Sequence, residues 1–260
     1  MTRTRLPLLA AFALLAGAST AASQARAPAE ASTESPVPAE LWGNVTLDFP
    51  KGDRWLFETD FEPKTLISGG EKWWNLDVTP LTEFYPSPWI DLVGETTFGY
   101  TRQTDDVNTR ELTPRIGFRL NVLNNLRERT HFPLHALGRF RLATLVRFEY
   151  RNFSYSDGSP SQHSWRFRAR VELKVGINHA DSSLDKSLYG IFDAEEFVPL
   201  GEGVTERFVS KARMRSGLGY RLRYGTRFEI LYIRDWHRDA KDSPRQPTAD
   251  ILDLRLKLFF

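Results

Sequence analysis

In the last eleven residues, Asp250 to Phe260, apolar side chains recur at every second position from Leu252 to Phe260. The apolar positions are Leu252, Leu254, Leu256, Leu258 and Phe260, and the charged residues between them are Asp253, Arg255 and Lys257. Because successive side chains of a β-strand point to opposite faces, this segment predicts a strand with one apolar and one charged face. Such a strand suits a wall between lipid and water.

The same alternation recurs along most of the chain. Candidate strands cover residues 41–49, 54–67, 72–84, 89–103, 109–122, 137–155, 163–178, 187–198, 206–221, 226–238 and 250–260. Several are far longer than the ~5 to 6 residues typical of globular strands, and many approach or exceed the ~10 residues that a tilted strand needs to cross a bilayer. The pattern predicts an all-β fold, a single transmembrane antiparallel up-and-down barrel, rather than a soluble β-sandwich.

The number of strands is expected to be even. Single-chain bacterial barrels normally have an even number with both chain ends on the periplasmic side. We therefore expect twelve strands, with a further crossing hidden in Leu123–Ala136. The alternative is ten strands, if residues 41–49 do not span.

The amino terminus has the pattern of a secretory signal peptide. Arg3 and Arg5 precede a short apolar run, and small residues follow it. We expect residues 1–25 to be the signal peptide, with cleavage after Ser23 or Ala25, 26–40 to be a flexible periplasmic leader, and 41–260 to be the barrel. The expected location is the outer membrane of a Gram-negative bacterium.

The overall charge gives no sign of a nucleic-acid partner. Loss of residues 1–25 removes Arg3 and Arg5 from the 35 basic residues and none of the 33 acidic residues, which leaves 33 of each. No basic arm or cluster is present. The chain has no cysteine, so disulfides and thiolate sites are excluded.

The terminal aromatic residue resembles the closing strand of bacterial outer-membrane barrels. That resemblance implies that Phe260 is part of the signal read by the barrel assembly machinery, and it places Phe260 at the periplasmic rim. Outer-membrane lipid would be the other partner. Candidate residues for interfacial aromatic girdles are Trp42, Trp55, Trp73, Trp74, Trp89, Tyr100, Trp165 and Trp236.

Charged residues predicted to face inward form two walls. The basic wall comprises Arg139, Arg141, Arg147, Arg151, Arg166, Arg168, Arg170, Lys174, Arg213, Arg215 and Arg255. The acidic wall comprises Asp48, Glu58, Asp60, Glu62, Asp77, Asp91 and Glu95. If water fills the lumen, a transverse field would favour dipolar or anionic solutes and define a narrow channel for small polar or charged solutes. Alternatively, these charges pair with one another and close the barrel.

Enzyme motifs are sparse. Asp235 and His237 are two apart on one predicted strand and resemble the Asp-x-His pair of the omptin family of outer-membrane proteases, in which the His activates water. Such a protease also needs an acidic pair across the mouth, and Asp105-Asp106 is adjacent rather than spaced by one. A rim ion pair is the preferred interpretation, and a hydrolase is kept as a further alternative. No metal cluster or phosphate loop is visible, so we expect no enzyme activity and no cofactor.

Across most of the mature chain, the order of elements resembles an uncharacterised family of bacterial outer-membrane β-barrels classified as a domain of unknown function. The features that carry this resemblance are the Trp42–Phe61 hairpin, the Arg-rich segments 139–151 and 166–174, the acidic segment Asp193–Phe197, the strand end Gly217–Tyr220 and the aromatic terminus. The Arg-lined interior is also similar to small oligogalacturonate-specific porins, from which the acidic wall departs. Neither resemblance names the solute.

Overall fold

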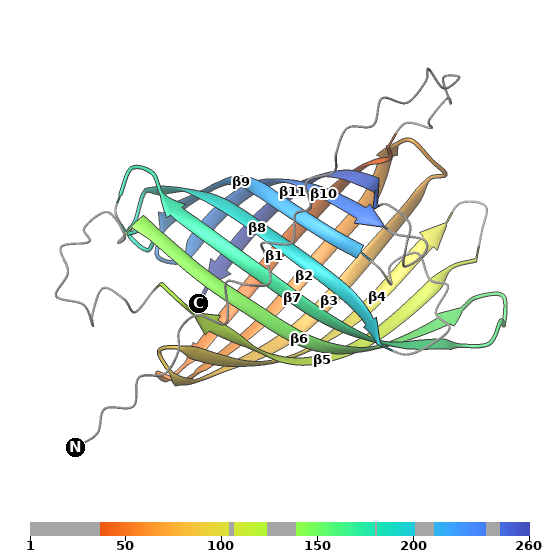
Figure 1. Ribbon diagram of the computed structural model, residues 1–260, viewed down its shortest axis with the longest axis horizontal. Coiled ribbons are helices and arrows are strands. Elements are labelled where there is room, and N and C mark those ends of the chain that lie inside the picture. The colour runs from red at the N-terminus through yellow and green to blue at the C-terminus, as the bar shows by residue number, and fades with distance from the viewer. Residues whose placement is uncertain (1–36, 104–106, 124–138, 180, 201–210, 238–244) are drawn as a thin grey trace, which may run out of the picture. The chain divides into compact units, whose positions relative to one another are not determined.

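The computed structural model describes residues 37–103, 107–123, 139–179, 181–200, 211–237 and 245–260. They form one closed barrel of eleven tilted strands (Figure 1). The strands are β1 (Ala39–Lys51), β2 (Trp55–Ser68), β3 (Trp73–Ser87), β4 (Ile90–Gln103), β5 (Thr109–Asn121), β6 (Phe140–Tyr155), β7 (Gln162–Gly176), β8 (Ser187–Leu200), β9 (Lys211–Arg223), β10 (Thr226–His237) and β11 (Gln246–Phe259). The all-β barrel predicted from the alternation is therefore confirmed, while the expected signal peptide and most of the leader lie outside the described residues.

The strand count is eleven, so the expectation of twelve strands and its alternative of ten are both wrong. Ten fails because β1 is a full member of the wall, paired with β2 on one side and with β11 on the other. Twelve fails because β5 pairs directly with β6, up to Asn121 opposite Ala143, and leaves no place for a strand between them.

An odd number of strands can close only if the first and last strands run parallel. β1 and β11 do so, from Ala39 opposite Asp250 to Asp48 opposite Phe259. The chain therefore enters the barrel at the end opposite Phe260, and the expectation that both ends of the barrel lie on one side is wrong. We call the end where β1 begins the entry rim and the end that holds Phe260 the exit rim.

The outer face of the barrel is apolar. Large hydrophobic side chains are exposed along it, and examples from separate strands are Phe57, Leu92, Ile116, Phe148 and Ile230. Among the predicted girdle residues, Trp55, Trp74 and Trp165 are exposed on this outer face. Trp42 and Trp73 instead line the interior, which corrects their placement at the lipid interface.

Part of the interior is filled by apolar side chains. The buried cluster comprises Tyr189, Ile191, Leu231, Ile233, Ala249 and Ile251, with Trp42 packed against it. Gly219 makes room for this packing, because a Cβ there would lie 2.3 Å from a ring carbon of Tyr189. This apolar cluster occupies the β8, β10 and β11 side of the lumen. Within the described residues, no helix is long and apolar enough to cross a membrane.

Candidate functional site: the charged lumen

The lumen contains a cavity of about 880 Å³, and every strand contributes to its lining. Lining residues extend from Gln103 and Tyr155 near the entry rim to Tyr85 and Phe259 near the exit rim. Most of the side chains between them are charged or carry a hydroxyl or amide group. Because charged side chains alternate with outward apolar ones on each strand, the period-two pattern of the sequence is what places them here.

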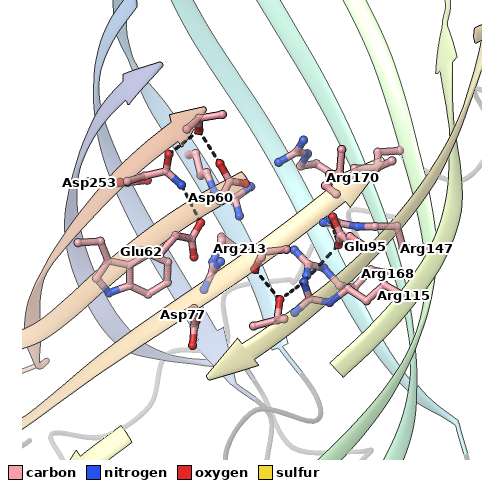
Figure 2. Close-up of a pocket in the computed structure, with 18 of the residues that line it drawn as sticks. Asp60, Glu62, Asp77, Glu95, Arg115, Arg147, Arg168, Arg170, Arg213 and Asp253 are labelled. Carbon is pink, nitrogen blue, oxygen red and sulfur yellow. Dashed lines mark hydrogen bonds and ion pairs between the residues drawn. The ribbon is translucent and has the colours of Figure 1, made fainter. Parts of the chain in front are cut away.

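One side of the lumen is crossed by what we call the arginine network. Its members are Arg115, Arg147, Arg166, Arg168 and Arg215, together with Glu95, Glu149, Asp193 and Glu195. Figure 2 shows Arg115, Arg147 and Arg168 gathered around Glu95 on this side of the cavity. The network runs from β4 to β9, so it ties together six strands that are adjacent in the barrel.

Glu149 is the most heavily shared carboxylate of the arginine network. It is fully buried and lies 2.5 Å from Arg166 Nη2, 2.8 Å from Arg168 Nη1 and 3.1 Å from Arg115 Nε. Three guanidiniums around one carboxylate would repel one another unless further acids balanced them. The arginine network supplies these acids, because Arg115 also reaches Glu95 and Arg168 also reaches Glu195.

Glu195 closes the other end of the arginine network. Its oxygens lie 2.6 Å from Arg168 Nη2, 2.7 Å from Arg215 Nη2 and 3.4 Å from Arg147 Nη2. Arg215 also binds Asp193 at 2.6 Å. Buried charges of this kind are tolerated only when they are paired and hydrogen-bonded. Here the acids come from β4, β6 and β8, and each of these strands lies beside a strand that supplies an arginine.

The β1–β3 side is built differently, and we keep the name acidic wall for its residues Asp48, Glu58, Asp60, Glu62 and Asp77. Two lysines serve four of these carboxylates. Lys257 Nζ lies 2.6 Å from Glu58 and 3.2 Å from Asp48. Lys64 Nζ lies 3.0 Å from Glu62 and 2.6 Å from Asp77. Asp60 accepts a hydrogen bond from Thr46 Oγ1 at 2.5 Å. Carboxylates therefore outnumber cations on this wall.

Three predicted wall residues lie elsewhere than expected. Arg139 is exposed at the exit rim, where Nη1 donates to the carbonyl oxygens of Gly176 and Ile177, so it does not line the lumen. Arg255 adjoins the acidic wall, because closure of the barrel places β11 beside β1. It binds Asp253 at 2.7 Å. Glu95, predicted to be on the acidic wall, belongs to the arginine network.

Arg151, Lys174 and Asp91, which were also predicted to lie on the two walls, form ion pairs with residues on their own strand or on an adjacent strand. Arg151 lies 3.2 Å from Glu111, and Lys174 lies 3.3 Å from Glu172. Asp91 accepts hydrogen bonds from Asn121 and lies 3.6 Å from Arg119 Nη1.

Arg141 binds Asp181 in the turn between β7 and β8. Partial burial raises the pKa of Asp181, but hydrogen bonds from Ser183 and the nearby Arg141 outweigh it and leave the pKa below its usual value. This turn is therefore held by an ionised carboxylate at neutral pH.

Asp235 forms ion pairs with Arg213 and Lys211 near the entry rim. Its two oxygens accept from Arg213 Nε at 2.7 Å and Arg213 Nη2 at 3.0 Å, and Lys211 Nζ lies 2.5 Å away. His237 lines the same cavity. Asp105 and Asp106 lie outside the described residues. No group of His, Asp or Glu side chains in the described ranges could hold a metal ion.

Two aromatic residues that sequence reasoning did not assign to the lumen organise its cations. Arg213 lies over the rings of Trp42 at 4.7 Å and Phe197 at 5.7 Å. Lys64 also lies over Trp42 at 4.7 Å, and Arg168 lies over Phe197 at 4.7 Å. These cation–ring contacts form a continuous series from Lys64 of β2 to Arg168 of β7, on the side of the lumen that holds the apolar cluster. The sequence could have placed Phe197 in the lumen, because it is spaced by two from Glu195 and by four from Asp193 and so lies on the same face of the strand.

Taken together, the structure is a closed β-barrel with an apolar exterior and a charged interior. The chain belongs to the family described as protein of unknown function (DUF2490), which matches residues 39–246. This confirms the resemblance to an uncharacterised barrel family that the sequence suggested. No curated protein matches the chain. The similarity to oligogalacturonate-specific porins therefore stays a prediction.

Proposed function

We propose that this protein is a non-enzymatic barrel of the bacterial outer membrane that forms a narrow passage for small polar or charged solutes. The observation that carries the proposal is the polar cavity, whose lining residues extend from one rim to the other. A dry, closed lumen would have to neutralise nearly every charge, since an unpaired buried ion costs several kcal/mol. The acidic wall has fewer cations than carboxylates, which favours water in the lumen.

Membrane insertion is supported by the outer face. Its exposed side chains include Phe57, Ile116 and Phe148, which would be costly in water over so wide a surface. The strands have 12 to 16 residues, more than the ~9 to 11 needed for a tilted crossing. An exterior of this kind suits lipid, with the charged face turned toward the lumen.

The passage would be narrow for two reasons. Eleven strands lie between the eight-stranded barrels that side chains fill and the 16- to 18-stranded barrels that hold open channels. The side chains of the arginine network and of the apolar cluster also project into the lumen from β4 to β11. They narrow the cavity that is left for a solute.

The decisive experiment is single-channel recording of the purified mature protein in a planar bilayer. We expect stepwise conductance that falls as the salt ions become larger. Ala143 lines the cavity, whereas Ala169 lies on the outer face of β7. Ala143→Trp should therefore reduce the conductance and the matched Ala169→Trp should not. Folded protein that inserts but never conducts would contradict a passage.

The arginine network favours one second candidate, a closed structural barrel filled by salt bridges. Its nine members are all ion-paired, as a filled interior requires. This candidate predicts the opposite of the passage in the bilayer recording, namely insertion without conductance. Hydrolysis of peptides or lipids by the same sample would instead revive the hydrolase alternative with Asp235 and His237.

The proposed outer-membrane location includes a role for Phe260 in assembly. Its backbone N–H donates to the carbonyl oxygen of Asp48 at 3.0 Å, and its ring stacks on Phe49 with centroids 5.1 Å apart. Deletion of Phe260 should leave export intact and reduce the heat-modifiable, membrane-inserted form. Phe49→Ala removes only the stacking partner, so an equal defect in that variant would assign the effect to packing rather than to an assembly signal.

A further inference from the structure

Two charged side chains near the middle of the lumen lack an ion-pair partner among the described residues. Within the described part of the chain, Asp60 of β2 is bonded only to the Thr46 hydroxyl. Arg170 of β7 makes no hydrogen bond or salt bridge to any described residue, and its Nε is buried without a partner there. Both residues line the cavity. The other carboxylates of the acidic wall and of the arginine network differ from Asp60, because each is paired with an arginine of the network or with Lys64 or Lys257.

Their neighbours on the same strand faces are already satisfied. Glu58 and Glu62 flank Asp60, and they bind Lys257 and Lys64 respectively. On β7, Arg168 belongs to the arginine network, and Glu172 is bound by Lys174 at 3.3 Å. Of the described residues on these two strand faces, Asp60 and Arg170 are therefore the charged side chains that no ion pair holds.

The two side chains lie on opposite sides of the cavity. Figure 2 shows Arg170 and Asp60 separated by the lumen, with Arg170 extending toward the acidic wall. β2 and β7 are five steps apart in the ring of eleven strands, which is the greatest separation possible. A ring of this size, with strands about 4.8 Å apart and tilted by about 40°, is roughly 22 Å across between backbones. The two side chains then leave a gap on the order of 10 Å.

We propose that the lumen holds a binding site for a short zwitterionic molecule, with its ammonium group at Asp60 and its carboxylate at Arg170. This inference deepens the proposed passage by naming the class of solute. A guanidinium can hold a carboxylate through two parallel hydrogen bonds, and an aspartate accepts from an ammonium. The opposed walls would orient such a dipole and would discriminate against a simple anion or cation, each of which is repelled by one wall.

The gap sets the length of the ligand. After allowing about 3 Å for a hydrogen bond at each end, roughly 4 to 8 Å remain between the ammonium nitrogen and the carboxylate. A dipeptide has this span, since its two ends lie about 6 Å apart when extended, and a tripeptide reaches it only when bent. A single α-amino acid is too short to reach both groups. Short peptides with free ends are therefore the ligands with the right charges and the right length.

The test is calorimetric titration of the folded full barrel in detergent micelles, which measures binding without requiring conduction. The probes are glycine, diglycine and triglycine. We expect diglycine or triglycine to bind at least ten-fold more tightly than glycine. Acetylating the amino end or amidating the carboxyl end should each weaken binding at least ten-fold. Equal binding of the free, acetylated and amidated peptides would overturn the proposal.

Variants assign each end of the ligand to its residue. In Asp60→Asn, acetylation should no longer matter while amidation still weakens binding, and in Arg170→Gln the reverse should hold. Asp60→Asn keeps the size of the side chain, and Arg170→Gln shortens it but leaves a neutral polar group. Neither substitution breaks an ion pair between described residues, and heat modifiability confirms folding. Arg110→Gln on the outer face and Asp157→Asn in an exposed loop are matched controls that should bind like wild type. Wild-type binding by both lumen variants would refute the site.

The binding experiment and the conductance experiment can fail independently of each other. Stepwise conductance without peptide binding would refute the binding site and leave the passage standing. Peptide binding without conductance would support the site and refute the passage.

Discussion

The arginine network and the acidic wall pair their charges in opposite ways. In the arginine network one carboxylate, such as Glu149, is shared by three guanidiniums. On the acidic wall one lysine, such as Lys257, is shared by two carboxylates. Arginine presents several donors in a rigid planar fork and can bridge neighbouring strands, whereas lysine is a flexible point charge. The arginine network is therefore a set of cross-linked charges, whereas the charges of the acidic wall are only loosely neutralised.

The two walls should contribute differently to the molecule. A cross-linked set of buried ion pairs holds strands β4–β9 in one arrangement, and loss of one member leaves its partners buried and uncompensated. The acidic wall borders the cavity, so a carboxylate that loses its lysine can be solvated. Stability should therefore depend on the arginine network, and selectivity on the charges next to the cavity.

The largest effect is expected for Glu149→Ala. The substitution strands Arg115, Arg166 and Arg168 around an empty position and should lower the free energy of unfolding by about 3 to 5 kcal/mol. Denaturant titration of the barrel in micelles measures it. Glu196→Ala, at an exposed carboxylate on the outer face of β8, is the control and should change little. A loss below about 1 kcal/mol for Glu149→Ala would mean that the arginine network is not cross-linked as the contacts indicate.

A second prediction tests the shared premise that both walls face away from lipid. Phe148 is 47% exposed on the outer face. Phe148→Arg should cost about 2 to 4 kcal/mol if it lies near the bilayer midplane. On the same strand Ala143 faces the cavity opposite Glu172, so Ala143→Arg should be mild. Equal costs in a folding titration into lipid vesicles would show that the outer face is not in contact with lipid.

Removing a cation from the acidic wall should have an intermediate effect. Lys64→Met deprives Glu62 and Asp77 of their ion pair, but Asn44 and Asn75 still donate hydrogen bonds to them and the cavity can hydrate them. We expect a loss of about 1 to 3 kcal/mol, below that of Glu149→Ala. The same denaturant titration applies, with Lys51→Met at the exposed end of β1 as control. A loss as large as that of Glu149→Ala would erase the contrast between the walls.

The strands and their facing were predictable because a period of two is a local property. All the described strands lie within a few residues of the predicted segments. The count was wrong because it relied on an even-number rule, and parallel closure of β1 on β11 leaves no local trace. The register between neighbouring strands could not be predicted either, so the sequence did not show that Glu149 is shared by three arginines. The inward facing of Leu231 and Ile233 follows from their period-two spacing with Asp235, but their packing into one apolar cluster depends on register.

The smallest effect on stability is expected for Arg170→Gln, and the same change at Arg168 provides the matched comparison. The two residues share strand β7 and its inner face, but Arg168 binds Glu149 and Glu195 while Arg170 binds no carboxylate of a described residue. Arg170→Gln should alter the free energy of unfolding by no more than about 0.5 kcal/mol, and Arg168→Gln by several times more. Loss of the cavity charge at Arg170 should nevertheless shift the reversal potential under a salt gradient toward cations. A variant at Arg170 with wild-type ion selectivity would show that this side chain does not border the conducting path, and equal destabilisation by the two changes would place Arg170 inside the arginine network after all.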